Sequence, residues 1–203
     1  MASAMIFLAA VFDFFDGFAA RALNAKSPIG GELDSLSDVV SFGVAPSFIV
    51  AWLLGHTGIS WMFMNINIFP MLAFVLAAFA AVRLAKFNID TRQTSSFIGL
   101  PVPTVGLFIA SLPFMLFHIE RESMLYNFVV NPYFLLAIVA IFSWLMISEV
   151  PFFSFKIKNL KFKENILRYF VVIFAITAVV ILQWMALPFI FLFYILLSVI
   201  CYR

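Results

Sequence analysis

The chain reads Asp13-Phe-Phe-Asp16-Gly17-Phe-Ala-Ala20-Arg21 and, a short way on, Gly30-Gly-Glu-Leu-Asp34-Ser-Leu-Ser-Asp38. These two segments hold four aspartates, in a protein of 203 residues that has ten acidic side chains and is 65% hydrophobic. A charge inside a membrane costs several kcal/mol unless it is paired, hydrated or bound to a metal. We therefore expect the chemistry of this protein to lie at these aspartates.

The remainder of the chain predicts a helical membrane protein. Runs of about 20 apolar residues can cross a hydrocarbon core as helices, whereas a barrel would need alternating polar and apolar positions, which we do not find. We predict one all-α domain over residues 1–203, a polytopic transmembrane helix bundle. Its seven hydrophobic segments are 1–24, 33–54, 62–86, 101–118, 132–150, 167–184 and 187–202.

Basic residues gather in alternate connections between these segments. They are Arg21, Lys26, Arg83, Lys86, Arg92, Lys156, Lys158, Lys161, Lys163 and Arg168. The positive-inside rule makes these connections cytoplasmic, together with both acidic segments. The lysines from 156 to 163 are either a solvated loop that sets this topology or a site for anionic lipid. His56 and His118 are expected at helix ends, and the single Cys201 allows no disulfide.

Helical spacing aligns the aspartates. Asp13, Asp16, Gly17 and Ala20 share one helical face, and Gly30, Asp34 and Asp38 share another. A turn over residues 24–30 would join the two helices and bring four carboxylates together. Such a group suits Mg²⁺ or Mn²⁺, which prefer oxygen ligands and leave positions for phosphate. The small residues leave room for a phosphorylated ligand, and Arg21 can neutralise a phosphate oxygen.

Two other interpretations explain these residues less completely. A helix interface built from small residues would explain the glycines but not four aspartates in phase. A divalent-cation transporter would use intramembrane acids as a transit site. However, the acids crowd one membrane end, and the transporter hypothesis gives Gly17, Ala20 and Arg21 no function. The residues favour phosphoryl-group chemistry.

The full pattern, Asp-x2-Asp-Gly-x2-Ala-Arg-x8-Gly-x3-Asp-x3-Asp, resembles the signature of the CDP-alcohol phosphatidyltransferases, with every fixed position filled. The resemblance implies a membrane-embedded helical homodimer that moves a phosphatidyl group from a CDP-activated lipid to an alcohol and releases CMP. Asp13, Asp16 and Asp34 look like metal ligands, and Asp38 like a ligand that is also the general base. The implied CDP contacts are Gly17, Arg21 and Ser27, with Ala20 and Gly30 giving room. Ser27 is alternatively a turn residue before Pro28.

Three further stretches resemble bacterial membrane-embedded phosphatidylserine synthases. They are Asp34-Ser-Leu-Ser-Asp38-Val-Val-Ser41-Phe-Gly43-Val-Ala-Pro46, Arg83-Leu-Ala-Lys86-Phe-Asn88 and Gly99-Leu-Pro101-Val-Pro103. Val39 stands where phosphatidylglycerophosphate synthases typically have lysine. This resemblance implies CDP-diacylglycerol and L-serine as substrates, in phospholipid biosynthesis at the cytoplasmic side of the bacterial inner membrane. Other acceptors, glycerol 3-phosphate or inositol phosphate, stay open.

The resemblance also bears on the acceptor site and on the N-terminus. Arg83 and Lys86 would bind the carboxylate of serine, and Asn88 its amino or carboxylate group. The two cations alternatively extend to the membrane interface. The family has a further helix ahead of the motif helix, so eight helices are implied where we count seven, and we expect this chain to lack the first. No nucleic-acid partner is expected.

Overall fold

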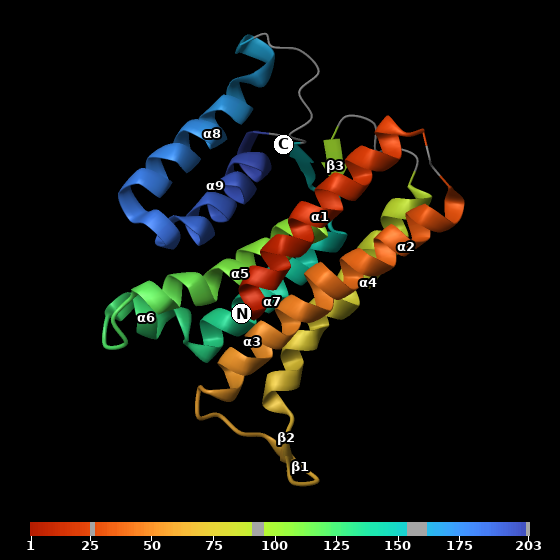
Figure 1. Ribbon diagram of the computed structural model, residues 1–203. Helices are drawn as coiled ribbons and strands as arrows, with labels where there is room; N and C mark the ends of the chain where they lie inside the picture. The colour runs from red at the N-terminus through yellow and green to blue at the C-terminus, as the bar shows by residue number, and fades with distance from the viewer. Residues whose placement is uncertain (25–26, 91–95, 154–161, 202–203) are drawn as a thin grey trace.

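The computed structural model describes residues 1–24, 27–90, 96–153 and 162–201, and its architecture is that of a helix bundle (Figure 1). The α-helices are α1 (Ala2–Ala22), α2 (Pro28–Asp38), α3 (Ala45–Gly55), α4 (Val75–Ile89), α5 (Val102–His118), α6 (Met124–Val129), α7 (Pro132–Ile147), α8 (Phe162–Leu182) and α9 (Ala186–Cys201). A π-helical turn, η1 (Val39–Val44), makes α2 and α3 continuous, and the 3-10 helices η2 (Phe69–Phe74) and η3 (Gln183–Met185) precede α4 and α9. Two antiparallel ribbons, β1 (Met62–Phe63) with β2 (Ile66–Asn67) and β3 (Ser96–Ile98) with β4 (Pro151–Phe153), complete the fold.

The predicted all-α membrane bundle is confirmed. Four helical stretches are long and apolar enough to cross a membrane: Ala2–Ala22, Pro28–Gly55, Phe69–Ile89 and Asn165–Ile200. The apolar helices α5 and α7 are shorter. Each of the seven predicted segments overlaps at least one of the observed helices.

The starts of three predicted segments were wrong, and one of them is the segment predicted from residue 167, which is helical from Phe162. The segment predicted from residue 62 begins instead with the β1–β2 ribbon, and helix starts only at Phe69. The reason is local, because the side chain of Asn67 accepts the backbone N–H groups of Trp61 at 3.0 Å and of Phe69 at 3.1 Å. The segment predicted from residue 33 is helical from Pro28, whose fixed φ suits the first helical position.

Helix α5 lies at the centre of the bundle. It packs against α1, α3 and α9, and its Ile109 and Phe108 are fully buried. Helix α1 is peripheral by comparison, since only Ser3 and Ile6 of its residues are buried. The second half of α1, which carries the aspartates, therefore faces α2 without being covered by the core.

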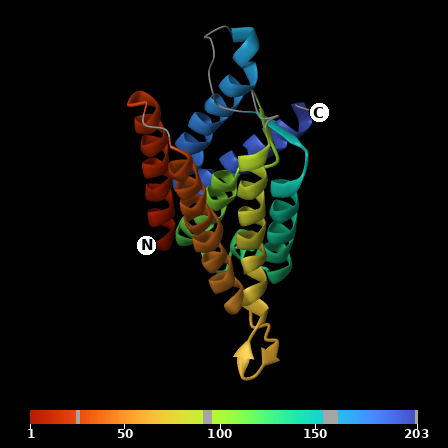
Figure 2. The ribbon, with the colours of Figure 1, turned by 90° about the vertical axis from the view of Figure 1, so that its right-hand side faces the viewer.

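The polar connections are divided between the two ends of the molecule. The α1–α2 turn and the β3–β4 ribbon lie at one end, and the β1–β2 ribbon lies at the opposite end (Figures 1 and 2). The predicted clustering of basic connections at one end agrees with this arrangement for Arg21, Arg83 and Lys86. Lys26, Arg92, Lys156, Lys158 and Lys161 lie outside the described residues. His118 ends α5 and His56 caps α3, as predicted.

Candidate active site

The turn between α1 and α2 brings the two acidic faces opposite each other. Ser27 is the N-cap of α2, and its Oγ accepts the backbone N–H of Gly30 at 3.1 Å. This bond satisfies one of the donors that every helix leaves unpaired at its N-terminus. Asn24 adopts a left-handed conformation with φ of 55°, which reverses the chain after α1. The structural interpretation of Ser27 is thus confirmed, and its predicted contact with CDP stays a prediction.

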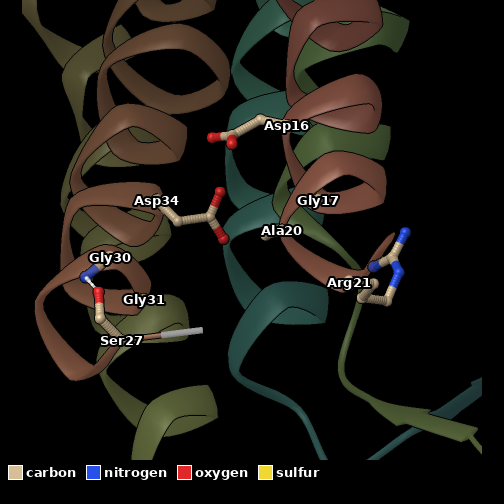
Figure 3. Close-up of a pocket in the computed structure, with 8 residues that line it drawn as sticks. All are labelled: Asp16, Gly17, Ala20, Arg21, Ser27, Gly30, Gly31 and Asp34. Carbon is tan, nitrogen blue, oxygen red and sulfur yellow. Dashed lines mark hydrogen bonds between the residues drawn. The ribbon is translucent and has the colours of Figure 1, made fainter. Parts of the chain in front are cut away.

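A first cavity of about 400 Å³ lies between the two helices beside this turn, and we call it the outer compartment (Figure 3). It is lined by Asp16, Gly17, Ala20, Arg21, Ser27, Gly30, Gly31 and Asp34. Asp16 and Asp34 extend toward each other from facing helices (Figure 3). The outer compartment therefore combines a cationic side chain with three glycines and a pair of carboxylates.

The guanidinium of Arg21 lies beside Gly17, at a distance that would leave a Cβ on Gly17 in ordinary van der Waals contact. A Cβ placed on Gly17 would lie 3.4 Å from Nη1 of Arg21, because the guanidinium folds back along α1 over this glycine. Arg21 is exposed and points away from Asp34 (Figure 3). Its charge is thereby held at the edge of the outer compartment, where an anionic ligand can meet it.

A second cavity of about 530 Å³, the inner compartment, continues from the first, farther from the turn. It is lined by Ala9, Phe12, Asp13, Asp16, Gly30, Leu33, Asp34, Ser37, Asp38, Ser41 and Phe42. Asp16, Gly30 and Asp34 border both cavities. We call the two compartments together the acid cleft. All four predicted aspartates line it, as their helical spacing predicted.

The carboxylates of the acid cleft repel one another. Asp13 is repelled by Asp34 and Asp16, and Asp38 by Asp13 and Asp34. Asp13 and Asp38 are half-buried, and Asp16 and Asp34 are exposed. Within the described part of the chain, none of the four forms an ion pair or accepts a hydrogen bond.

This donor set fits a hard divalent cation. All of its ligand atoms are carboxylate oxygens, and a cation would relieve their mutual repulsion. As the side chains are placed, no three acids, histidines or cysteines among the described residues are close enough to hold one ion. Rotation of the carboxylates about their side-chain bonds is therefore needed to bring them onto a common metal.

Arg83 and Lys86, the predicted acceptor ligands, lie elsewhere, and we call them the basic pair. Arg83 is only 4% exposed, and its Nη2 donates to the carbonyl oxygen of Gly99 at 3.5 Å. Lys86 donates from Nζ to the carbonyl oxygen of Ile147, the last residue of α7, at 3.2 Å. They border a cavity of about 20 Å³, which has room for one water molecule.

Asn88, the third predicted acceptor ligand, contacts the outer side of α2. Its Nδ2 donates to Oγ of Ser35 at 3.1 Å and to the carboxylate of Glu32 at 3.4 Å. Neither Asn88 nor the basic pair lines the acid cleft. Acceptor binding by these three residues stays a prediction, and the structure does not bring them together with the aspartates.

Sequence reasoning missed two hydroxyl groups in the cleft. Ser37 and Ser41 line the inner compartment beside Asp34 and Asp38. The signal was present in the sequence, since Ser37 follows Asp34 by three positions and Ser41 follows Asp38 by three. Residues three apart lie on the same helical face, so the rule that aligned the aspartates also selects these serines.

Comparisons with known proteins agree with the motif. The family model described as CDP-alcohol phosphatidyltransferase matches residues 1–195. A Bacillus subtilis protein named CDP-diacylglycerol–serine O-phosphatidyltransferase is 36% identical over 151 residues, covering 74% of this chain and 73% of the relative. Proteins of the same name from Helicobacter pylori strain J99 and Methanocaldococcus jannaschii are 40% and 32% identical, over 54% and 73% of this chain. The matches cover 44% and 61% of those two relatives.

Proposed function

The chain belongs to the CDP-alcohol phosphatidyltransferase family, and on that premise we propose that it transfers the phosphatidyl group of CDP-diacylglycerol to L-serine, giving phosphatidylserine and CMP. The observation that carries this proposal is the acid cleft, in which all four motif aspartates face one continuous space. The names of the relatives supply serine as the expected acceptor.

Asp13, Asp16, Asp34 and Asp38 would hold Mg²⁺ or Mn²⁺. When bound, such an ion neutralises charge on the pyrophosphate and on the attacking and leaving oxygens. The donor set supports this assignment, because these carboxylates have no cationic partner among the described residues.

The outer compartment suits the nucleotide end of the lipid substrate. Arg21 offers a positive charge at its edge, and Gly17, Ala20 and Gly30 leave the helix surfaces open to a close approach. The hydroxyl of Ser27 borders the same space. Binding here would direct the phosphatidyl phosphorus toward the carboxylates that divide the two compartments.

The reaction is a displacement at phosphorus. Asp38, half-buried in the inner compartment, would accept the proton of the serine hydroxyl. The serine oxygen would form a bond to the lipid-side phosphorus as the bond from that phosphorus to the CMP oxygen breaks. CMP leaves with the electron pair of the broken bond, so charge and atoms balance.

The lining of the inner compartment favours serine over a phosphorylated acceptor. Among the described residues that form it there are four aspartates and neither lysine nor arginine. Glycerol 3-phosphate or inositol phosphate would bring further negative charge next to these acids. Serine brings an ammonium group together with its carboxylate, so its net charge is close to zero.

We further propose a homodimer in the bacterial inner membrane, with the acid cleft on the cytoplasmic side. The position of Arg21, Arg83 and Lys86 at one end of the bundle supports this orientation through the positive-inside rule. The family resemblance supports the dimer.

The test is CMP release by the purified protein from CDP-diacylglycerol across a panel of acceptors. L-serine with Mg²⁺ or Mn²⁺ should support release, and glycerol 3-phosphate and inositol phosphate should not. Addition of EDTA should abolish the activity, and excess metal should restore it. Release that depends on another alcohol, or that persists after metal removal, would contradict the proposal.

A further inference from the structure

The continuous helix from Pro28 to Gly55 carries four serines, which differ in the hydrogen bonds of their hydroxyl groups. Ser35 and Ser47 each donate from Oγ to the carbonyl oxygen four residues earlier, at 3.1 Å and 2.8 Å. This is the usual way for a helical serine to satisfy its hydroxyl. Ser37 and Ser41 line the inner compartment instead, and their hydroxyls have no hydrogen-bond partner among the described residues.

The backbone around Ser41 is fixed by its neighbours. Ser41 lies in the π-helical turn η1, which starts directly after Asp38. A Cβ placed on Gly106 of α5 would lie 2.9 Å from Cα of Phe42, so α5 approaches this turn as closely as a glycine allows. On the other side, a Cβ on Gly43 would lie 2.9 Å from Cβ of Ala80 in α4. The π-helical turn is therefore held between two helices. Such turns often mark functional sites.

An acceptor with a carboxylate needs hydrogen-bond donors in the inner compartment, and these serines can supply them. Its other described walls are either carboxylates or apolar side chains such as Phe12, Leu33 and Phe42. An acceptor that carries a carboxylate is repelled by the aspartates, and it requires hydrogen-bond donors to enter. Ser37 and Ser41 are the neutral side-chain donors on this wall, and Ser41 is half-buried, where such a bond is shielded from water.

We propose that Ser41, assisted by Ser37, donates a hydrogen bond to the carboxylate of the amino-acid acceptor and thereby turns the acceptor hydroxyl toward Asp38. The inference rests on the proposed function, since it names the residues that read the acceptor in that same cleft. It makes Ser41 a determinant of acceptor specificity, while the nucleotide is bound by other residues in the outer compartment.

The test compares Ser41→Ala and Ser37→Ala with Ser35→Ala, a control on the same helix whose hydroxyl lies outside the cleft. A hydrogen bond to a charged group is typically strong enough that its loss weakens binding about 10-fold or more. Ser41→Ala should raise the KM for L-serine by about that factor and leave the KM for CDP-diacylglycerol within about twofold. Ser37→Ala should raise the serine KM less. Ser35→Ala should leave the serine KM unchanged, because its only expected effect is a small loss of kcat through its bonds to Asn88.

Two further measurements separate recognition from folding. Ser41→Thr retains the hydroxyl and should restore the serine KM. L-serine methyl ester lacks the carboxylate charge, so Ser41→Ala should reduce the preference of the enzyme for serine over this ester. An active wild type with an unchanged serine KM in Ser41→Ala, or an equal loss with both acceptors, would overturn this inference alone. A wild-type protein without serine-dependent CMP release would overturn the proposed function as well.

Discussion

The acid cleft and the basic pair lie at the same end of the bundle, yet they differ in how far the chain itself satisfies their polar groups. In the cleft, four like charges border two adjoining cavities of about 400 and 530 Å³, without hydrogen bonds to described residues. In the basic pair, Arg83 and Lys86 each donate to a backbone carbonyl oxygen beside a cavity of about 20 Å³. Even in the basic pair one atom, the buried Nε of Arg83, has no hydrogen-bond partner among the described residues.

The difference leads us to expect a binding site at the acid cleft and a structural junction at the basic pair. Unpaired charges around a large space can be satisfied only by something that enters it. Charges that already bond to the chain beside a space for one water contribute mainly to holding helices together. We therefore expect different functions for these two regions, although the family resemblance implied one active site for both.

Removing one carboxylate tests whether the acid cleft is the active site. We expect Asp38→Asn to lower kcat about 100-fold or more, because the amide cannot accept the proton of the acceptor, while the KM for CDP-diacylglycerol changes little. The control is Glu32→Gln, which removes an acidic charge from the same helix outside the cleft. Steady-state CMP release measures both. Wild-type turnover in Asp38→Asn would show that another group is the base.

Arg83→Met tests whether the basic pair stabilises the fold. The substitution keeps the bulk but removes the bond to Gly99, and the loss of a hydrogen bond from a buried cation costs about 1–3 kcal/mol. We expect a lower unfolding temperature in detergent with an unchanged KM for L-serine. Lys86→Met, at an exposed position, should lower it less. A raised serine KM at unchanged stability would instead support the acceptor site that the sequence predicted.

Asn88 tests the boundary between the two regions, and here we expect the smallest effect. Its amide bonds to Ser35 tie α4 to the helix that carries Asp34 and Asp38. Asn88→Ala should lower kcat only about two- to fivefold, since an exposed hydrogen bond contributes on the order of 1 kcal/mol. Ser35→Ala should have a similar effect, and the double variant should be no worse than either single one. Additive losses would show that the two residues act separately.

Much of the fold and of the cleft was predictable from local rules. Hydropathy located every long helix, because the length needed to cross a membrane is a strong constraint, and it missed only the short helix α6 among the described helices. Helical spacing aligned Asp13 with Asp16 and Asp34 with Asp38, and the structure places all four on one cleft. The same rule applied three residues further along would have included Ser37 and Ser41.

The remaining features depend on contacts between distant parts of the chain. Hydropathy cannot separate the apolar ribbon at 62–67 from a helix, because the decision is made by the side-chain bonds of Asn67. Nothing near Arg83 in sequence indicates that its partner is the carbonyl of Gly99, in a residue with φ of 79°. A Cβ on Gly99 would lie 2.5 Å from the carbonyl oxygen of Met146. Because Gly99 and Met146 are far apart in sequence, this close approach exists only in the assembled bundle.

The β3–β4 ribbon can form only late in the synthesis of the chain. Every described residue that lines the acid cleft lies between Ala9 and Phe42, so all of these residues are translated early. The ribbon pairs Ser96 with Phe153 and Ile98 with Pro151, and it cannot close until α7 has been translated and inserted. Newly made chains therefore hold a complete set of aspartates well before the junction around Arg83 exists.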